Sequence, residues 1–118
     1  MSRRSDRFRL QHMLDHAREA VQLARDRSRE TLDDDRLLSL ALVRLLEIVG
    51  EAAGRVSESC RAAYPEIPWP QIVGLRNRLI HGYDAVDMDI LWQVLARDLP
   101  PLAEKLESIL RSQDTLGE

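Results

Sequence analysis

The chain of 118 residues is long enough to bury one hydrophobic core and too short for two ordinary domains. Hydrophobic residues make up 44% and charged residues 31%, which is typical of a folded globular protein and argues against disorder. The net charge of −3 excludes a protein that binds nucleic acid through its overall charge. Five aromatic residues and five glycines are few for a β-sandwich or barrel, so the composition favours helices.

The sequence also predicts the compartment. The longest apolar stretch, residues 37–49, is interrupted by Arg44 and Glu47, so we expect no membrane span. The basic residues near the start are not followed by an apolar segment, which argues against a secretory signal. The single cysteine, Cys60, has no second cysteine to pair with and no identifiable base nearby. We therefore expect a cytoplasmic protein without a catalytic thiol.

The first half of the chain predicts two helices. Ser5 or Asp6 is expected to cap a first helix, whose apolar residues recur every three or four positions to about residue 27. Polar residues 28–35 follow, and a second helix is predicted from about residue 36 to residue 56. Apolar residues lie on two sides of this second helix, with Gly50 outside the main stripe. This pattern predicts a contact with a second subunit, where Gly50 would allow close approach.

The second half predicts further short helices. Residues 57–64 extend or restart the second helix, which Pro65 stops. A helix is expected over about residues 69–81, with Gly82 as its C-terminal cap. Asp87 should cap a helix over residues 88–97. Two prolines at 100 and 101 then kink the chain or open a last helix.

These elements predict an all-α fold, a compact bundle of four to five antiparallel helices. We expect a single domain over residues 1–118, with frayed ends at about 1–5 and 112–118. Trp69 and Trp92 stand beside apolar residues and are expected to fill the core.

Residues 75–83, LRNRLIHGY, carry the candidate chemistry. On a continuous helix Arg76 would project from an apolar arc, where a charge is unfavourable unless it is paired or faces a cleft. Asn77 and His81 would lie one turn apart, but Arg76 and His81 would diverge by about 140°, given roughly 3.6 residues per turn. The reach of the arginine, distortion at the helix end, or two copies meeting at a two-fold axis would bring the two together.

An arginine, a histidine and a tyrosine hydroxyl without an acidic ligand cluster suit metal-free cleavage of RNA. An imidazole of ordinary pKa, roughly 6.5, accepts a proton from a ribose 2′-hydroxyl or donates one to a leaving oxygen. Arg76 would stabilise charge on the phosphoryl oxygens, Asn77 would hold the phosphate or orient the imidazole, and Tyr83 could fold its hydroxyl toward His81. The spacing alone favours a structural role for these residues, with the histidine bonded to a carbonyl and the arginine in an ion pair.

The segment RNRLIHGY resembles the R-x4-H-x-Y motif of HEPN-domain ribonucleases, and more specifically the HepT toxin family. Three longer stretches resemble the same family: LEIVGEAAGRVSE, YPEIPWPQIVGLRNRLIHGYDAVD and ILWQVLARDLPPLAEKLESIL. The resemblance covers about residues 6–111, although the first helix is similar only in pattern. It implies a helical bundle that forms a two-fold dimer, with the motif residues of both subunits lining one cleft.

The resemblance further implies the toxin of a type VII toxin–antitoxin system. Arg76 and His81 would be the catalytic pair of a metal-independent RNA endonuclease acting on tRNA or mRNA, with Asn77 in support and no cofactor. An MntA-type nucleotidyltransferase antitoxin would neutralise the toxin by transferring AMP to Tyr83, and the two would form a heteromeric complex. The added group would bring bulk and negative charge to the place where RNA phosphate must bind. No membrane or DNA partner is expected.

Several other residues are candidates for a functional role. His12 and His16 form an HxxxH pair that suits either a metal or, more often, a solvated helix face. Arg44, Glu47 and Glu51 line one stripe of the second helix as an ion-pair ladder, and by family likeness Glu51 would orient Arg76.

The arginine distribution is uneven: residues 1–30 hold eight arginines against five acidic residues. This bias reflects either composition alone or an arginine-rich arm near a phosphate-bearing partner.

A different class of function remains open at this point. The same surface would serve a non-catalytic helical module that docks a minimal nucleotidyltransferase or binds nucleotides. A purely structural bundle is the third alternative, and the arginine on the apolar arc argues against it.

Overall fold

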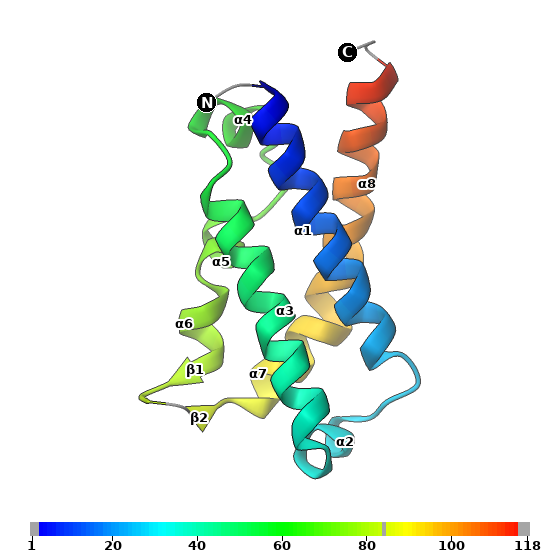
Figure 1. Cartoon of the computed structure of the whole chain (residues 1–118), viewed down its shortest axis with the longest axis vertical. Coiled ribbons are helices and arrows are strands. Elements are labelled where there is room, and N and C mark those ends of the chain that lie inside the picture. The colour runs from blue at the N-terminus through cyan, green and yellow to red at the C-terminus, as the bar shows by residue number, and fades with distance from the viewer. Residues whose placement is uncertain (1–2, 84, 116–118) are drawn as a thin grey trace.

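The computed structural model describes residues 3–83 and 85–115, which form an all-α bundle. Three long helices run along it: α1 (Arg3–Ala24), α3 (Arg36–Gly54) and α8 (Leu99–Thr115). α1 packs against both of the others and runs antiparallel to them (Figure 1). The molecule measures 47 × 30 × 20 Å. The predicted all-α class is therefore confirmed.

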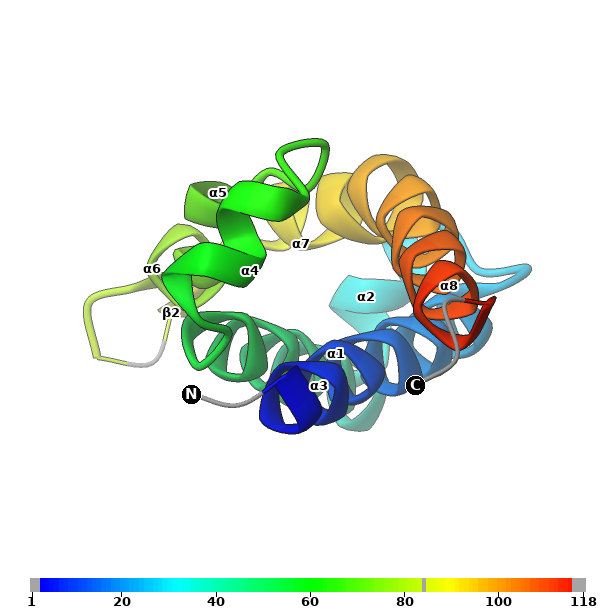
Figure 2. The ribbon, with the colours of Figure 1, turned by 90° about the horizontal axis from the view of Figure 1, so that it is seen from above.

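Shorter elements complete the bundle. α2 (Arg29–Asp34) connects α1 and α3 at one end, and its buried Leu32 anchors the polar segment that was expected to be a plain connection. α4 (Glu58–Ala63), α5 (Trp69–Val73) and α6 (Leu75–Leu79) follow α3, and α5 and α6 pack on it. α7 (Met88–Gln93) and a π-helix, η1 (Val94–Asp98), lead into α8. Seen along the long axis, the helices surround one core (Figure 2).

The core is built mainly from leucine side chains, each of which contributes about 1.5–3 kcal/mol when fully buried. The largest fully buried side chains come from every long helix: Leu10, Met13, Leu32, Leu42, Leu46, Val49, Ile67, Leu75, Leu79, Leu91, Leu99 and Leu106. Trp69 is buried, and its indole N–H donates to the carbonyls of Arg61 and Tyr64. Trp92 packs half-buried against the core, so both tryptophans lie where the sequence predicts.

Aspartate side chains define one helix start and one contact between distant segments. The Asp35 side chain accepts a hydrogen bond from the Leu38 N–H at the start of α3. Asp6, in contrast, does not cap α1, which already begins at Arg3. Its buried carboxylate accepts from the backbone N–H and the hydroxyl of Ser57, at 2.9 and 2.6 Å. The prediction that Ser5 or Asp6 caps the first helix is therefore wrong, because Asp6 joins α1 to the start of α4 instead.

The helix predicted over residues 69–81 is two helices and part of a hairpin. α5 ends and α6 begins at Gly74, and α6 ends at Leu79. The strands β1 (Ile80–His81) and β2 (Ala85–Val86) then pair antiparallel. The Leu79 carbonyl accepts from the Asp87 N–H at 2.8 Å, so the chain folds back where a helix would have continued. Gly82 lies in the hairpin rather than at a helix C-terminus, and the prediction for it is wrong.

Gly50 permits close approach, but within the same chain. A Cβ at this position would lie 2.9 Å from the backbone oxygen of Ile72 in α5 and 3.8 Å from the Leu75 Cβ. The additional face of α3 that carries Gly50 is therefore covered by α5 and α6 at this point. At Gly50 the close neighbour is therefore α5 of the same chain and not the predicted second subunit.

The two consecutive prolines near the start of α8 explain the π-helix before it. Neither Pro100 nor Pro101 has an N–H to donate to the preceding turn. The Leu99 N–H donates to the carbonyl of Val94, five residues earlier, which widens the turn. The prolines thus open the last helix, as one of the two predicted alternatives had it.

Both ends of the described chain are helical. Residues 3–5 belong to α1 and residues 112–115 to α8, although the sequence predicts fraying there; the remaining residues of the predicted frayed ends lie outside the described part. None of the helices in the described residues is long and apolar enough to cross a membrane.

Candidate active site

Arg76 is held on the surface of α6 by an ion pair to α3. Its neighbours Leu75 and Leu79 are fully buried and fix the orientation of the short helix. The Arg76 side chain is 68% exposed, and its Nε donates to the Glu47 Oε2 at 3.2 Å. The two terminal Nη groups are therefore positioned at the surface, where a phosphate could accept from both.

Glu47 is the residue that sequence reasoning missed as the partner of Arg76. Its side chain is only 18% exposed and lies between Arg76 and Arg44, whose Nη1 is 3.5 Å from the other carboxylate oxygen. Glu51 was expected to orient Arg76, but in the structure Glu51 pairs with Arg44, also at 3.5 Å. The stripe of Arg44, Glu47 and Glu51 was visible in the sequence, but the member that faces α6 was not.

A cavity of about 310 Å³ lies beside this ion pair, between α3 and the α5–α6 segment. Glu47, Glu51, Arg76 and Asn77 line it, together with Gly50. The lack of a side chain at Gly50 brings α5 close to α3 and shapes this cavity. The structure thus brings Asn77 and Glu51 to the same cavity as Arg76.

His81 lies on β1, next to the tip of the hairpin. Gly82 follows it with φ = +69°, a left-handed conformation that glycine adopts without strain. The His81 side chain is 61% exposed, and its Nε2 is 3.5 Å from the Asp87 Oδ2. Nδ1 is the ring nitrogen that remains for another partner. The arrangement of an exposed imidazole backed by a carboxylate resembles a general base or acid with its orienting group.

Asp87 was predicted only as a helix cap, and it has this second contact as well. Its Oδ1 accepts from the Ile90 N–H at 3.0 Å at the start of α7, while Oδ2 faces His81. The pKa of Asp87 is lowered, chiefly because the Ile90 N–H donates to the carboxylate; the Asp89 N–H and His81 add to the effect. Asp87 therefore stays ionised at neutral pH and presents a negative charge to the imidazole.

Tyr83 stands apart from the other motif residues. Its side chain is 97% exposed in the hairpin connection, so the hydroxyl is not folded back against His81 as the sequence suggested. The geometric expectation that Asn77 and His81 stack on one helix is also wrong, because α6 ends before His81. Arg76 faces α3, whereas His81 lies against the start of α7.

Two other candidates have structural explanations. His12 and His16 are half-buried rather than on a solvated face: His16 Nδ1 is 2.7 Å from the His12 carbonyl, and the two rings meet edge to face. In residues 3–83 and 85–115, no group of three or more His, Cys, Asp or Glu side chains is placed to hold a metal ion. Burial raises the pKa of the Cys60 thiol, as does the nearby charge of Asp6, which does not suit a nucleophile.

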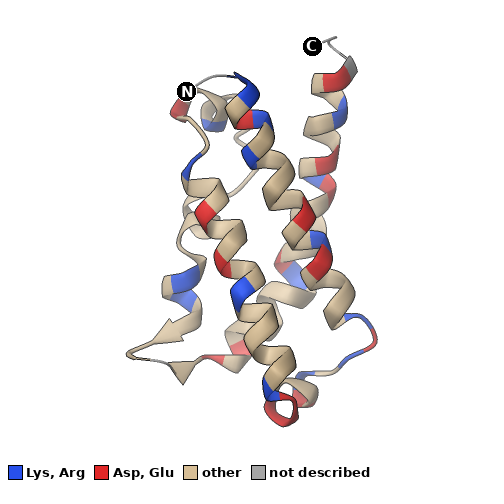
Figure 3. Cartoon of the chain, viewed as in Figure 1, with Lys and Arg blue, Asp and Glu red and all other residues tan. Residues whose placement is uncertain are grey.

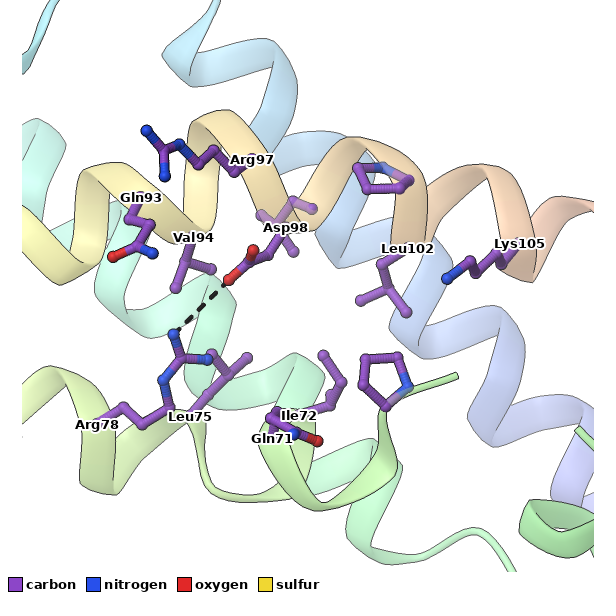
Figure 4. A pocket seen from close by; sticks show the side chains of 13 residues that line it. Gln71, Ile72, Leu75, Arg78, Gln93, Val94, Arg97, Asp98, Leu102 and Lys105 are labelled. Atoms are coloured by element: carbon purple, nitrogen blue, oxygen red, sulfur yellow. Dashed lines mark ion pairs between the residues drawn. The ribbon is translucent and has the colours of Figure 1, made fainter. Parts of the chain in front are cut away.

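A larger cleft of about 370 Å³ lies on the other side of α6, between α5–α6 and η1–α8. Figure 4 shows Arg78 and Asp98 facing each other across it, 3.6 Å apart. Apolar side chains such as Ile72, Val94 and Leu102 form its floor. The ion pair neutralises one of its basic groups, and this cleft does not contain Arg76 or His81.

Comparison with known proteins identifies the family of this chain. The model of a family described as ribonuclease HepT-like matches residues 13–109. A Methanocaldococcus jannaschii protein named as an RNase is 31% identical over 109 residues, which cover 92% of this chain and 100% of the relative. "Probable ribonuclease HepT" of Thermococcus cleftensis is 35% identical over 100 residues, 81% of this chain and 91% of the relative.

A third relative, from Caldanaerobacter subterraneus subsp. tengcongensis and also named as an RNase, is 32% identical over 104 residues, 88% of this chain and 93% of the relative. No solved structure matches the chain. The family match spans both the Arg44–Glu51 stripe and the segment from Arg76 to Tyr83. The chain is therefore a ribonuclease of the HepT-like family.

Proposed function

We propose that the chain is a metal-independent RNA endonuclease and the toxin of a type VII toxin–antitoxin pair. One observation carries the catalytic part: Arg76, anchored by Glu47, and His81, backed by Asp87, are both more than half exposed on consecutive elements of a ribonuclease fold. A cation and a titratable imidazole are the groups that phosphodiester cleavage needs.

The proposed reaction uses the ribose 2′-hydroxyl as the nucleophile. Its oxygen forms a bond to phosphorus, and the bond from phosphorus to the 5′ oxygen breaks. An imidazole accepts the proton of the 2′-hydroxyl, and a second proton goes to the leaving 5′ oxygen. Arg76 stabilises the charge on the phosphoryl oxygens, with Asn77 as a supporting donor. The products carry a 2′,3′-cyclic phosphate and a 5′-hydroxyl.

A two-fold dimer completes this mechanism. Each chain offers His81 as its single imidazole in the motif, and one imidazole performs only one of the two proton transfers at a time. Within the chain Arg76 faces α3 and His81 faces Asp87. In the proposed dimer, the motif residues of both copies line one cleft, so that one His81 acts as base and the other as acid.

Regulation is proposed to act at Tyr83. An MntA-type nucleotidyltransferase antitoxin transfers AMP to its hydroxyl and associates with the toxin in a heteromeric complex. The support is the exposure of Tyr83, at 97%, because a modifying enzyme must enclose the acceptor side chain. Its position two residues after His81 would bring the phosphate of AMP near the site of RNA phosphate binding. The RNA substrate is a tRNA or mRNA of the cytoplasm.

The test is cleavage of total tRNA by the purified protein in EDTA, after intact mass has confirmed unmodified Tyr83. We expect cleavage by the wild type, retained in Arg25→Ala and lost in His81→Ala. Arg25→Ala is the control because Arg25 is exposed just after α1 and lies outside the motif. A folded, unmodified dimer that leaves tRNA and mRNA intact would contradict the proposal and favour a module that docks the nucleotidyltransferase without cleaving RNA.

A further inference from the structure

The strongest unassigned feature is a basic cavity between α1 and α3. Its volume is about 310 Å³, and its polar lining consists of Arg9, His12, His16, Arg44, Glu51 and Arg55. Three guanidinium groups face one carboxylate, so the lining carries a net positive charge even with both imidazoles neutral. The molecule as a whole carries −3, which makes this concentration of arginines a local property. Figure 3 shows basic residues gathered along the first turns of α1.

Two of the three arginines that line this cavity remain available to a ligand. Within the described residues, no ion pair involves Arg9 or Arg55, and Arg44 is shared between Glu47 and Glu51. The Arg9 Nε is buried and has no hydrogen-bond partner. A buried donor without an acceptor is energetically unfavourable. The cavity therefore offers donors that an anionic ligand would satisfy.

An aromatic column borders the cavity on α1. The ring of Phe8 is 55% exposed, which is unusual for a phenylalanine, and it stacks on His12 with centroids 5.2 Å apart. His12 in turn meets His16 at 4.8 Å, and the Arg9 guanidinium lies 5.3 Å from the Phe8 centroid. Exposed aromatic rings beside arginines are the feature on which single-stranded nucleic acids stack their bases.

The cavity adjoins the candidate active site. Glu51 lines both this cavity and the one that contains Arg76 and Asn77. Arg44, in the basic cavity, contacts Glu47, which holds Arg76. A strand whose phosphate lies between α1 and α3 would thus continue toward Arg76 along the same face of α3.

We propose that Arg9, Arg44 and Arg55 bind a phosphate of single-stranded RNA flanking the bond that is cleaved, and that Phe8 and His12 stack on an adjacent base. This inference rests on the proposed ribonuclease function and adds a substrate subsite to it. Arg44 also anchors Glu47, so the subsite and the catalytic arginine share one ion-pair network.

The experiment measures binding separately from cleavage. A fluorescently labelled single-stranded RNA of about 12 nucleotides, a length suited to such sites, is titrated against the full chain carrying His81→Ala, which keeps the RNA intact. We expect Arg9→Ala/Arg55→Ala in that background to weaken binding about tenfold, and to lower the slope of log K against log salt concentration by about 1.4, since each single-strand phosphate contact accounts for roughly 0.7. Arg25→Ala/Arg27→Ala is the matched control, because both arginines are exposed in the connection that follows α1.

The stacking part has its own comparison. Phe8→Leu should weaken binding about fivefold or more, and Phe8→Tyr should restore it, because stacking needs the ring. Unchanged affinity and salt slope in the arginine variant would overturn the subsite even if the wild type cleaves tRNA in EDTA. Arginine-dependent binding without any cleavage would support the subsite and overturn the catalytic assignment.

Sedimentation velocity on the same variants distinguishes an RNA subsite from an interface between copies of the chain. If Arg9→Ala/Arg55→Ala or Phe8→Leu changes the mass of the assembly, this face is an interface between copies and the proposal is overturned. Arg55 is exposed at the end of α3, so Arg55→Ala alone provides a second variant if the double variant does not fold. That single variant should lower the salt slope by about half as much.

Discussion

The carboxylate of Asp87 joins two roles, capping α7 through Oδ1 and facing the imidazole of His81 through Oδ2 at 3.5 Å. The hairpin makes this possible, because the Asp87 N–H is itself bonded to the Leu79 carbonyl at 2.8 Å. The end of α6, the position of His81 and the start of α7 are thus fixed together by one residue.

The two roles of Asp87 can be separated by substitution. Asparagine caps helices about as well as aspartate, but it brings no negative charge to His81. We expect Asp87→Asn to lower kcat for RNA cleavage while reducing the thermal midpoint much less than Asp87→Ala, which loses both the cap and the charge. Circular dichroism melts and single-turnover cleavage check this. If Asp87→Asn cleaves as fast as the wild type, the carboxylate is not an orienting group.

The lowered pKa of Asp87 predicts a pH dependence of stability. A carboxyl whose pKa is lower in the folded state contributes stability above its unfolded pKa, about 3.9, and loses that contribution as the pH falls through the folded value. Urea unfolding of the wild type and Asp87→Asn should therefore differ by more at pH 7 than at pH 3. A difference that grows on acidification would contradict the assigned direction of the shift.

Glu47, rather than Glu51, should matter for catalysis. Glu47→Gln removes the charge that holds Arg76, and we expect kcat/KM to fall about tenfold, less than the roughly hundredfold that a misplacement of about 1 Å can cause. Glu51→Gln, the comparison on the same stripe of α3, should lower kcat/KM less than Glu47→Gln, because Glu51 pairs with Arg44 and not with Arg76. Equal losses in the two variants would show that general charge at this cavity, and not the contact to Arg76, is what counts.

Gly50 should tolerate no side chain. In Gly50→Ala the new Cβ would lie 2.9 Å from the Ile72 oxygen, and a backbone atom yields little, so we expect a loss of about 1–3 kcal/mol in the free energy of unfolding. Gly54→Ala is the control, because its nearest heavy atom outside α3 would be 4.0 Å away and alanine favours the helix. Urea denaturation measures both. A neutral Gly50→Ala would mean that α5 shifts freely on α3.

Tyr83→Phe should separate modification from folding. The side chain is almost wholly exposed, so the free energy of unfolding should match that of the wild type within about 0.5 kcal/mol. Incubated with the cognate nucleotidyltransferase and ATP, the wild type should gain the mass of AMP and Tyr83→Phe should not. Full neutralisation of Tyr83→Phe by the partner would show that AMP transfer to this tyrosine is not the mechanism.

Local patterns in the sequence predicted much of the fold. Periodic leucines in residues 36–56 predicted α3 to within two residues of its end, and the capping preference of Asp87 marked the start of α7. These features follow from local physics, namely the period of the helix and the hydrogen bonds at its termini. The motif from Arg76 to Tyr83, together with the resemblance to HepT toxins, likewise pointed to the family that the comparisons confirm.

The contact partners of the individual side chains depend on long-range packing, which the sequence did not predict. The sequence offered Glu47 and Glu51 one turn apart, and the packing of α6 on α3 selected Glu47 for Arg76. A continuous helix over residues 69–81 was locally reasonable, but pairing of β1 with β2 and the Asp87–Leu79 hydrogen bond replaced it with a hairpin. Asp6 looked like a helix cap until Ser57, 51 residues later, supplied both of its donors. Such contacts join segments far apart in the chain, and local periodicity carries no information about which of them will meet.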